Sequence, residues 1–173
     1  KSHSCGLEAT LRGETLNKKL NYALSYGFTS TKFDEYTETT SGTIVDYKGK
    51  RVPFVPLHTL AANADYRIDV DPAALLDPSN KFHLCSVIVG LNLSAQGNTY
   101  WDEQNSIAQN FYVTLGAHAD ADFGPMHINL WVRNLTDTKY NTFAVQSAAT
   151  GNKYTFGQLG NPFQIGVDVS FHF

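Results

Sequence analysis

The sequence has little charge, no long apolar run and few cysteines. Charged residues make up 17% of the 173 residues, below the about 25% of typical soluble domains. No segment approaches the about eighteen continuous apolar residues of a transmembrane helix, so we expect no helical membrane span. The net charge of −3 offers no basic surface, and we therefore expect no nucleic-acid partner.

Motifs of catalysis and metal binding are missing as well. No GxSxG, Walker A, GxGxxG or HExxH pattern occurs, so the sequence predicts no enzyme and no cofactor. Cys5 and Cys85 lie outside any CxxC array, although a disulfide between them stays open as an alternative. His118, Asp120 and Asp122 alternate along one segment and could bind a divalent cation. A hydrated sheet wall is the favoured interpretation of these three residues, and we predict no metal site.

The chain is rich in strict alternation of apolar and polar residues, which is typical of β-strands with two different faces. The last segment, 163–173, places Phe, Ile or Val at every second position up to Phe173. About ten such residues suffice for a tilted strand to cross a bilayer. The same pattern recurs in residues 7–14, 20–29, 60–69, 86–95, 111–124 and 128–133. These segments predict an all-β fold, an antiparallel meander of about seven long strands in one domain, residues 1–173.

Short and long connections alternate between these segments. The short ones are 17–19, 71–80, which could hold a single helical turn, and 123–125; the long ones are 37–56, 102–110 and 142–161. Alternation alone does not decide which face of the sheet points inward. Short turns at one end and long loops at the other are typical of outer-membrane barrels, which favours a transmembrane β-barrel.

Four segments carry a family resemblance. Their sequences are GLEATLRGETLNKKLNYALSYGFTSTKFDEY, GKRVPFVPLHTLAANADYRI, INLWVRNLTDTKY and GNPFQIGVDVSFHF. In this order they resemble the carboxyl-terminal barrel segments of TonB-dependent outer-membrane receptors, with the patterns G-x-R-x-P-x-x-P-x-x-T, N-L-x-D-x-x-Y and G-x-P-x-x-x-G followed by a terminal F. One departure is Phe163, because an arginine often follows the proline in this family.

The resemblance implies a 22-stranded barrel in the outer membrane of Gram-negative cells, closed by an amino-terminal plug. Such receptors import a siderophore, cobalamin, haem or glycan and perform no chemistry of their own. The implied partners are outer-membrane lipid, the rest of the barrel, TonB through the plug, and the barrel assembly machinery. That machinery would recognise the last strand, and Phe173 is its predicted assembly signal.

The resemblance also implies that the long external loops contact the ligand. Our candidates for ligand binding are Tyr47, Lys48, Arg51, Tyr154 and Phe156, with ordinary solvated loops as the alternative.

Two other functions stay open: a stand-alone small β-barrel, lipocalin-like or of the eight-stranded outer-membrane type, that binds a small apolar ligand, and a structural or adhesion sheet. The chain starts at Lys1 within an alternating pattern, so we expect a piece of a longer protein that lacks the plug. Seven strands leave two open edges. In the isolated chain we expect capping by self-association, by closure into a small distorted barrel, or by detergent-stabilised pairing.

Overall fold

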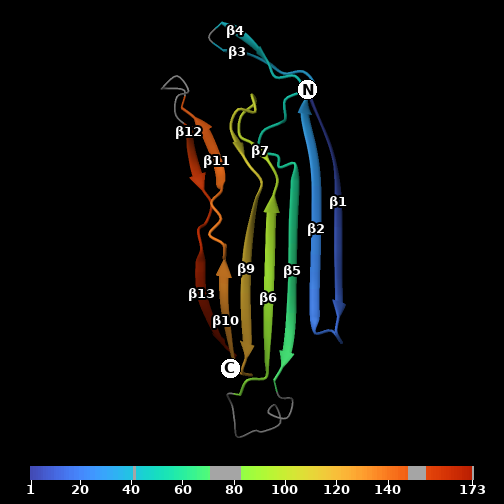
Figure 1. The fold of residues 1–173 in the computed structure, drawn as a ribbon, viewed down its shortest axis with the longest axis vertical. Helices are drawn as coiled ribbons and strands as arrows, with labels where there is room; N and C mark the ends of the chain where they lie inside the picture. Colours follow the sequence, from blue (N-terminus) through green and yellow to red (C-terminus); the bar gives the residue numbers. More distant parts are fainter. Residues whose placement is uncertain (41, 71–82, 148–154, 173) are drawn as a thin grey trace.

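Seven long strands form one antiparallel sheet in the computed structural model, which describes residues 1–40, 42–70, 83–147 and 155–172. The strands are β1 (Ser2–Thr15), β2 (Leu20–Phe33), β5 (His58–Asp69), β6 (Ser86–Gln96), β9 (Tyr112–Asp122), β10 (Met126–Arg133) and β13 (Gln164–Phe171). Their spatial order is β1-β2-β5-β6-β9-β10-β13, which is also their order along the chain (Figure 1). The predicted antiparallel meander is therefore confirmed.

Three small hairpins extend the sheet at the end where the long connections lie (Figure 1). They pair β3 (Thr37–Thr40) with β4 (Thr43–Asp46), β7 (Thr99–Tyr100) with β8 (Ala108–Gln109), and β11 (Asn141–Gln146) with β12 (Thr155–Leu159). We call this end of the sheet the hairpin end. The helical turn proposed for 71–80 lies outside the described residues. In the described ranges no helix has the length and apolar character needed to cross a membrane.

The register of the ladder sorts the side chains into uniform rows across the sheet. One row that crosses all seven strands is Gly13, Tyr22, Ala64, Leu91, Ala117, Val132 and Ile165. The neighbouring row, on the opposite face, is Glu14, Asn21, Asp65, Gly90, His118, Trp131 and Gly166. Because side chains alternate along each strand, the sheet has one apolar face and one polar face.

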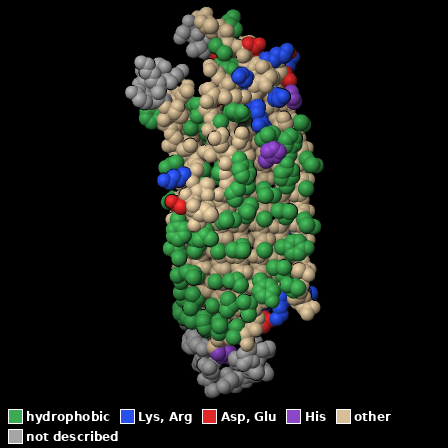
Figure 2. Space-filling model, viewed as in Figure 1, with side chains coloured by type: hydrophobic (Ala, Val, Ile, Leu, Met, Phe, Trp, Pro, Cys, Tyr) green, Lys and Arg blue, Asp and Glu red, His purple; other side chains and the backbone are tan. Residues whose placement is uncertain are grey.

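The apolar face is not packed against a second layer. Leu91 remains 64% exposed and Val167 59% exposed, and Figure 2 shows hydrophobic side chains spread over this face between charged ends. From His58 to Ile68, at about 3.4 Å per residue and a tilt of about 40°, the apolar rows span about 26 Å. This height matches the about 25 Å apolar band of outer-membrane barrels. The face is thus suited to contact with lipid.

The sheet is open in the described residues, because β1 and β13 are its two edges and do not pair with each other. Closure into a small distorted barrel, one of the predicted ways to cap the edges, is therefore wrong for this structure. A closed small barrel of the lipocalin type does not fit an open sheet either. The disulfide that the sequence left open is not formed: Cys5 is a free exposed thiol on β1, and Cys85 is free and buried before β6.

The turn between β1 and β2 is strained. Leu16, Asn17 and Lys18 have φ values of 53°, 56° and 66°, although a left-handed conformation costs a residue with a side chain about 1 kcal/mol or more. The N–H of Lys19 donates to the carbonyl oxygen of Leu16 at 3.1 Å and closes the turn. Glycine would adopt the same conformation without this cost.

We predict that Lys18→Gly stabilises the β1–β2 hairpin by about 0.5–1 kcal/mol, because relief of strain exceeds the added entropy of the unfolded chain. Urea unfolding of the barrel in lipid vesicles measures the effect. Glu14→Gly is the control, since Glu14 is exposed within β1 and pairs regularly with Asn21; it should lower stability. Equal changes in both variants would contradict strain in the turn.

Candidate functional site

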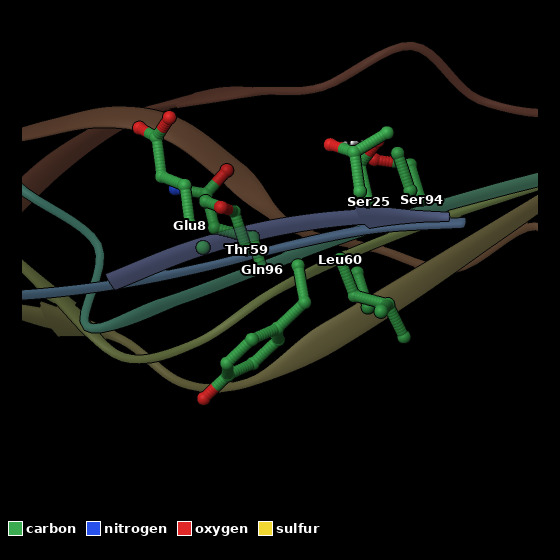
Figure 3. A pocket seen from close by; sticks show the side chains of 11 residues that line it. Glu8, Ser25, Thr59, Leu60, Ser94 and Gln96 are labelled. Carbon is green, nitrogen blue, oxygen red and sulfur yellow. Dashed lines mark hydrogen bonds between the residues drawn. The ribbon is translucent and has the colours of Figure 1, made fainter. Parts of the chain in front are cut away.

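The polar face of the sheet contains a shallow hollow of about 270 Å³ near the hairpin end of β1, β2, β5 and β6. Glu8, Ser25 and Ser94 project to one side of the sheet there, and Leu60 projects to the other (Figure 3). Thr59 pairs with Gln96 and belongs to the polar lining. Hydroxyl, amide and carboxylate groups of this kind can hydrogen-bond water or a polar solute. The hollow is therefore suited to bind a polar solute reversibly.

The same face becomes strongly charged toward the opposite end. His118 Nε2 lies 3.5 Å from Asp65 Oδ1 and 3.4 Å from Asp120 Oδ2. The indole N–H of Trp131 donates to Asp168 Oδ2 at 2.9 Å. Across the described residues no group of three or more His, Cys, Asp or Glu side chains could hold a metal ion. The arrangement is a wall of close polar contacts, which cross strands from His118 to Asp65 and from Trp131 to Asp168 and stay within β9 from His118 to Asp120.

Large side chains on this wall lie flat over glycines of the neighbouring strand. Trp131 covers Gly166 on β13, and His118 covers Gly90 on β6. A Cβ atom at either glycine would overlap the ring above it. Because glycine has no Cβ atom, the rings can lie close to the backbone of the sheet.

At the hairpin end, two loops are tied together by a reciprocal link. The backbone N–H of Arg51 donates to Asn105 Oδ1 at 2.7 Å, and Asn105 Nδ2 donates to the carbonyl oxygen of Arg51 at 2.9 Å. Asn105 also has a positive φ of 58°. The side chain of Asn105 thus fixes the segment before β5 to the loop between β7 and β8.

An aromatic cluster joins the same two loops to β11. The ring centroids of Phe54, Trp101 and Phe143 lie 5.7 to 6.3 Å apart in all three pairs. Phe54 is 57% exposed and has a φ of 65°. Its N–H donates to the carbonyl oxygen of Tyr100 at 2.8 Å. A backbone contact thus holds Phe54 in a strained conformation that occurs preferentially at functional sites.

One residue of the cluster, Trp101, comes directly after a strand that contacts the polar face. Gln96 Nε2 donates to Thr99 Oγ1 at 3.1 Å, which connects Thr99 with the polar lining of the sheet. Trp101 follows β7 directly, and its N–H donates to the carbonyl oxygen of Ile107 at 2.9 Å. The Nε1 atom of Trp101 is buried, with no hydrogen-bond partner in the described part of the chain. Sequence reasoning missed this cluster; the available signal was the presence of aromatic residues in or directly beside all three long connections.

The predicted ligand residues lie on different elements. Tyr47 is only 5% exposed, and its hydroxyl donates to Glu38 Oε2 at 3.2 Å; burial raises the pKa of Tyr47. Lys48 is exposed beside β4, and Phe156 is 61% exposed on β12. The side chain of Arg51 reaches the carbonyl oxygen of Thr29 at 3.4 Å.

Tyr154 and Phe173 lie outside the described residues. The structure does not bring Tyr47, Lys48, Arg51 and Phe156 together into one site, and their contact with a ligand stays a prediction.

We predict that Asn105→Ala loosens the hairpin end, because it removes both hydrogen bonds to the Arg51 backbone, each worth about 0.5–1.5 kcal/mol. Arg51→Ala is the matched control, since both bonds use only its main chain and it removes only the 3.4 Å contact of its side chain with the carbonyl oxygen of Thr29. Limited proteolysis of the folded barrel should cleave the 47–57 segment at least several-fold faster in Asn105→Ala than in Arg51→Ala. Similar rates in the two variants would contradict the link.

Comparison with known proteins adds a family model and several relatives. The model described as TonB dependent receptor-like, beta-barrel, matches residues 1–135. The pesticin receptor of Yersinia pestis is 26% identical over 132 residues, which cover 73% of this chain and 17% of that protein.

Two solved structures share the fold. The ferric yersiniabactin uptake receptor FyuA of Yersinia pestis has a TM-score of 0.73 at 21% identity. The match covers 99% of this chain and 23% of the FyuA chain. The siderophore receptor PiuA of Acinetobacter baumannii has a TM-score of 0.76 at 22% identity. The match covers 98% of this chain and 22% of the PiuA chain. The chain thus spans less than a quarter of the length of each of these three relatives.

Proposed function

Because the chain belongs to the TonB-dependent receptor family, as a part of its β-barrel, we propose that it forms the carboxyl-terminal wall and the external mouth of an uptake receptor for a ferric siderophore. Proteins of this family are receptors of the Gram-negative outer membrane, and this is the location of the chain. They are transporters rather than enzymes.

The observation that carries the proposal is the two-sided register of the sheet. Rows such as Tyr22, Ala64 and Leu91 contain no charged residue, whereas the adjacent rows carry Asp65 and His118. Lipid can cover the first face, because exposed apolar side chains need an apolar medium. The second face can border a water-filled lumen. Such a wall guides a solute and performs no reaction on it.

The choice of a ferric siderophore over cobalamin, haem or a glycan is supported by the titles of the solved relatives. They name ferric yersiniabactin for one receptor and a siderophore for the other. Siderophore complexes combine polar oxygen or nitrogen donors with flat conjugated groups. The exposed rings of Phe54 and Phe143 can contact such groups, and the hydroxyl-lined hollow lies on the polar face near the same end of the sheet.

The remaining partners follow from the same proposal. The open edges of β1 and β13 would each pair with the rest of the barrel, and a plug would lie against the polar face and connect to TonB. The barrel assembly machinery would recognise the last strand. Lipid would surround the apolar face.

Uptake assays test the siderophore proposal and the aromatic cluster together. We expect the full-length receptor that contains this chain to take up ⁵⁵Fe-loaded yersiniabactin or citrate in a strain without its own receptor. Trp101→Ala should weaken binding about tenfold or more, because aromatic contacts at a site centre often exceed about 1.4 kcal/mol.

Phe111→Ala is the control, since Phe111 is 61% exposed at the same end but lies outside the cluster. Unchanged siderophore binding in Trp101→Ala would show that the aromatic cluster does not contact the siderophore. Absence of uptake for every ferric siderophore offered would refute the proposed ligand class.

The assembly role of Phe173 is tested separately. Deletion of Phe173 from the full-length receptor should reduce the amount of folded barrel in the outer membrane, because the machinery would lose its terminal aromatic contact. Heat-modifiable migration in cold SDS gels measures the folded fraction. Phe173→Tyr, which keeps an aromatic ring, should assemble normally, and full assembly of the deletion variant would refute the signal.

A further inference from the structure

Two neighbouring strands of the wall are interrupted at the same level, just below the β11–β12 hairpin. The segment 134–140, between β10 and β11, and the segment 160–163, between β12 and β13, are both irregular. Figure 1 shows β11 and β12 as a continuation of β10 and β13 beyond this stretch. We call the two segments the junction. Because the strand ladder does not run through the junction, other contacts set the direction in which the hairpin leaves the wall.

The side chain of Asn134 bridges the two segments of the junction. Its Nδ2 atom donates to the carbonyl oxygen of Asn161 at 2.9 Å and to that of Thr138 at 3.0 Å. Its Oδ1 atom accepts from the N–H of Thr138 at 2.9 Å. Asn134 is only 6% exposed, so water has little access to these bonds. Its φ of 48° lies in the left-handed region, which asparagine adopts more readily than most residues with a side chain.

Asp137 forms a second bridge. Its Oδ1 atom accepts from the N–H of Phe163 at 3.0 Å, and its own N–H donates to the carbonyl oxygen of Asn134 at 2.9 Å. Nearer the hairpin, the N–H of Gly160 donates to the carbonyl oxygen of Tyr140 at 2.8 Å. Side chains therefore satisfy backbone groups that a continuous ladder would have paired.

The hairpin that leaves the junction carries one ring of the aromatic cluster. The ring of Phe143, on β11, is stacked on that of Phe54 at an interplanar angle of 5° and lies 6.3 Å from that of Trp101. At the start of β11, the N–H of Asn141 donates to Oε1 of Gln109, on β8, at 2.7 Å. A single contact of this kind would leave the hairpin free to turn about it. The bridges of the junction supply the further fixed points.

We propose that Asn134 is a positioning residue, which holds the β11–β12 hairpin, and with it Phe143, where the aromatic cluster forms. The inference rests on the proposed function only for the siderophore as the ligand of the cluster, since the direction of the hairpin needs no ligand. Without the bridge the hairpin would adopt several directions, and a fraction of the molecules would present the complete cluster. The apparent dissociation constant rises in inverse proportion to that fraction.

The direction of the hairpin is tested without siderophore, in the full-length receptor in lipid and in a cysteine-free background. Asn134→Gly removes the side chain, and glycine adopts the positive φ without strain. Spin labels on Thr155→Cys, exposed on β12, and Lys32→Cys, exposed on β2, report the position of the hairpin relative to the sheet. Double electron–electron resonance should give a narrow distance distribution in the parent and a clearly broader one in Asn134→Gly.

Thr136→Ala is the matched control for this measurement. Thr136 is exposed in the same segment, and its hydroxyl lies 2.8 Å from that of Thr138 within that segment. The control should keep the narrow distribution of the parent.

The link to the siderophore is tested by the concentration dependence of ⁵⁵Fe-yersiniabactin uptake, or of ⁵⁵Fe-citrate uptake where the receptor takes up citrate instead. Asn134→Gly should raise the half-saturating concentration about fivefold, as expected when about a fifth of the receptors present the complete cluster. The maximal rate should stay unchanged, because saturating siderophore selects the competent direction of the hairpin. Asp137→Asn keeps an acceptor for the N–H of Phe163 and should behave like the parent, whereas Asp137→Ala should resemble Asn134→Gly.

An unchanged distance distribution in Asn134→Gly would overturn the positioning role. A broadened distribution with an unchanged half-saturating concentration, or a loss of maximal rate alone, would overturn it as well. Heat-modifiable migration confirms that each variant is folded. If Trp101→Ala weakens binding and Asn134→Gly does not, the positioning role alone is refuted. A receptor that takes up no ferric siderophore refutes the proposed function, and the distance measurement then decides the positioning role by itself.

Discussion

Backbone hydrogen bonding between strands is the constraint on which the rest of this structure depends. Hydrocarbon offers no water to an unpaired N–H or C=O group, so each transmembrane strand needs a partner on both sides. The five inner strands of the sheet meet this requirement through ladders such as that of β5 and β6, which runs from Thr59–Gln96 to Asp69–Ser86. Because the ladder fixes the register, it also fixes which side chains share a face.

Two kinds of packing follow from that register. On the outward face, rows of medium-sized apolar side chains give lipid a surface without charge. On the inward face, large polar rings lie over glycines, as Trp131 does over Gly166, and reach partners such as Asp168 across the strands. Stability then comes from the ladders and cross-strand pairs, since only Tyr47, Cys85, Ala95 and Ala144 form the buried apolar set of the described residues.

The long strands were predictable because alternation is a local property of the sequence. The segment 60–69 differs from β5 by two residues at its start, and 86–95 differs from β6 by one at its end. The small hairpins were not predictable, since β7 and β8 contain two residues each. The link between Arg51 and Asn105 joins positions 54 residues apart, and no local pattern encodes it. Tyr47 was selected as an exposed loop aromatic, but the hairpin of β3 and β4 buries it.

The direction of the two edge strands limits how the wall can be completed. Neighbouring strands are antiparallel and the sheet has seven of them, so β1 and β13 run in the same direction (Figure 1). A second copy in the same orientation would bring β1 beside β13 in parallel, and an inverted copy would put its hairpin end on the opposite side of the membrane. Closure that is antiparallel at both edges, with all hairpins on one side, requires an odd number of further strands. The total is then even, as in bacterial single-chain barrels. This parity favours closure of the barrel by further strands of different sequence over self-association of the chain.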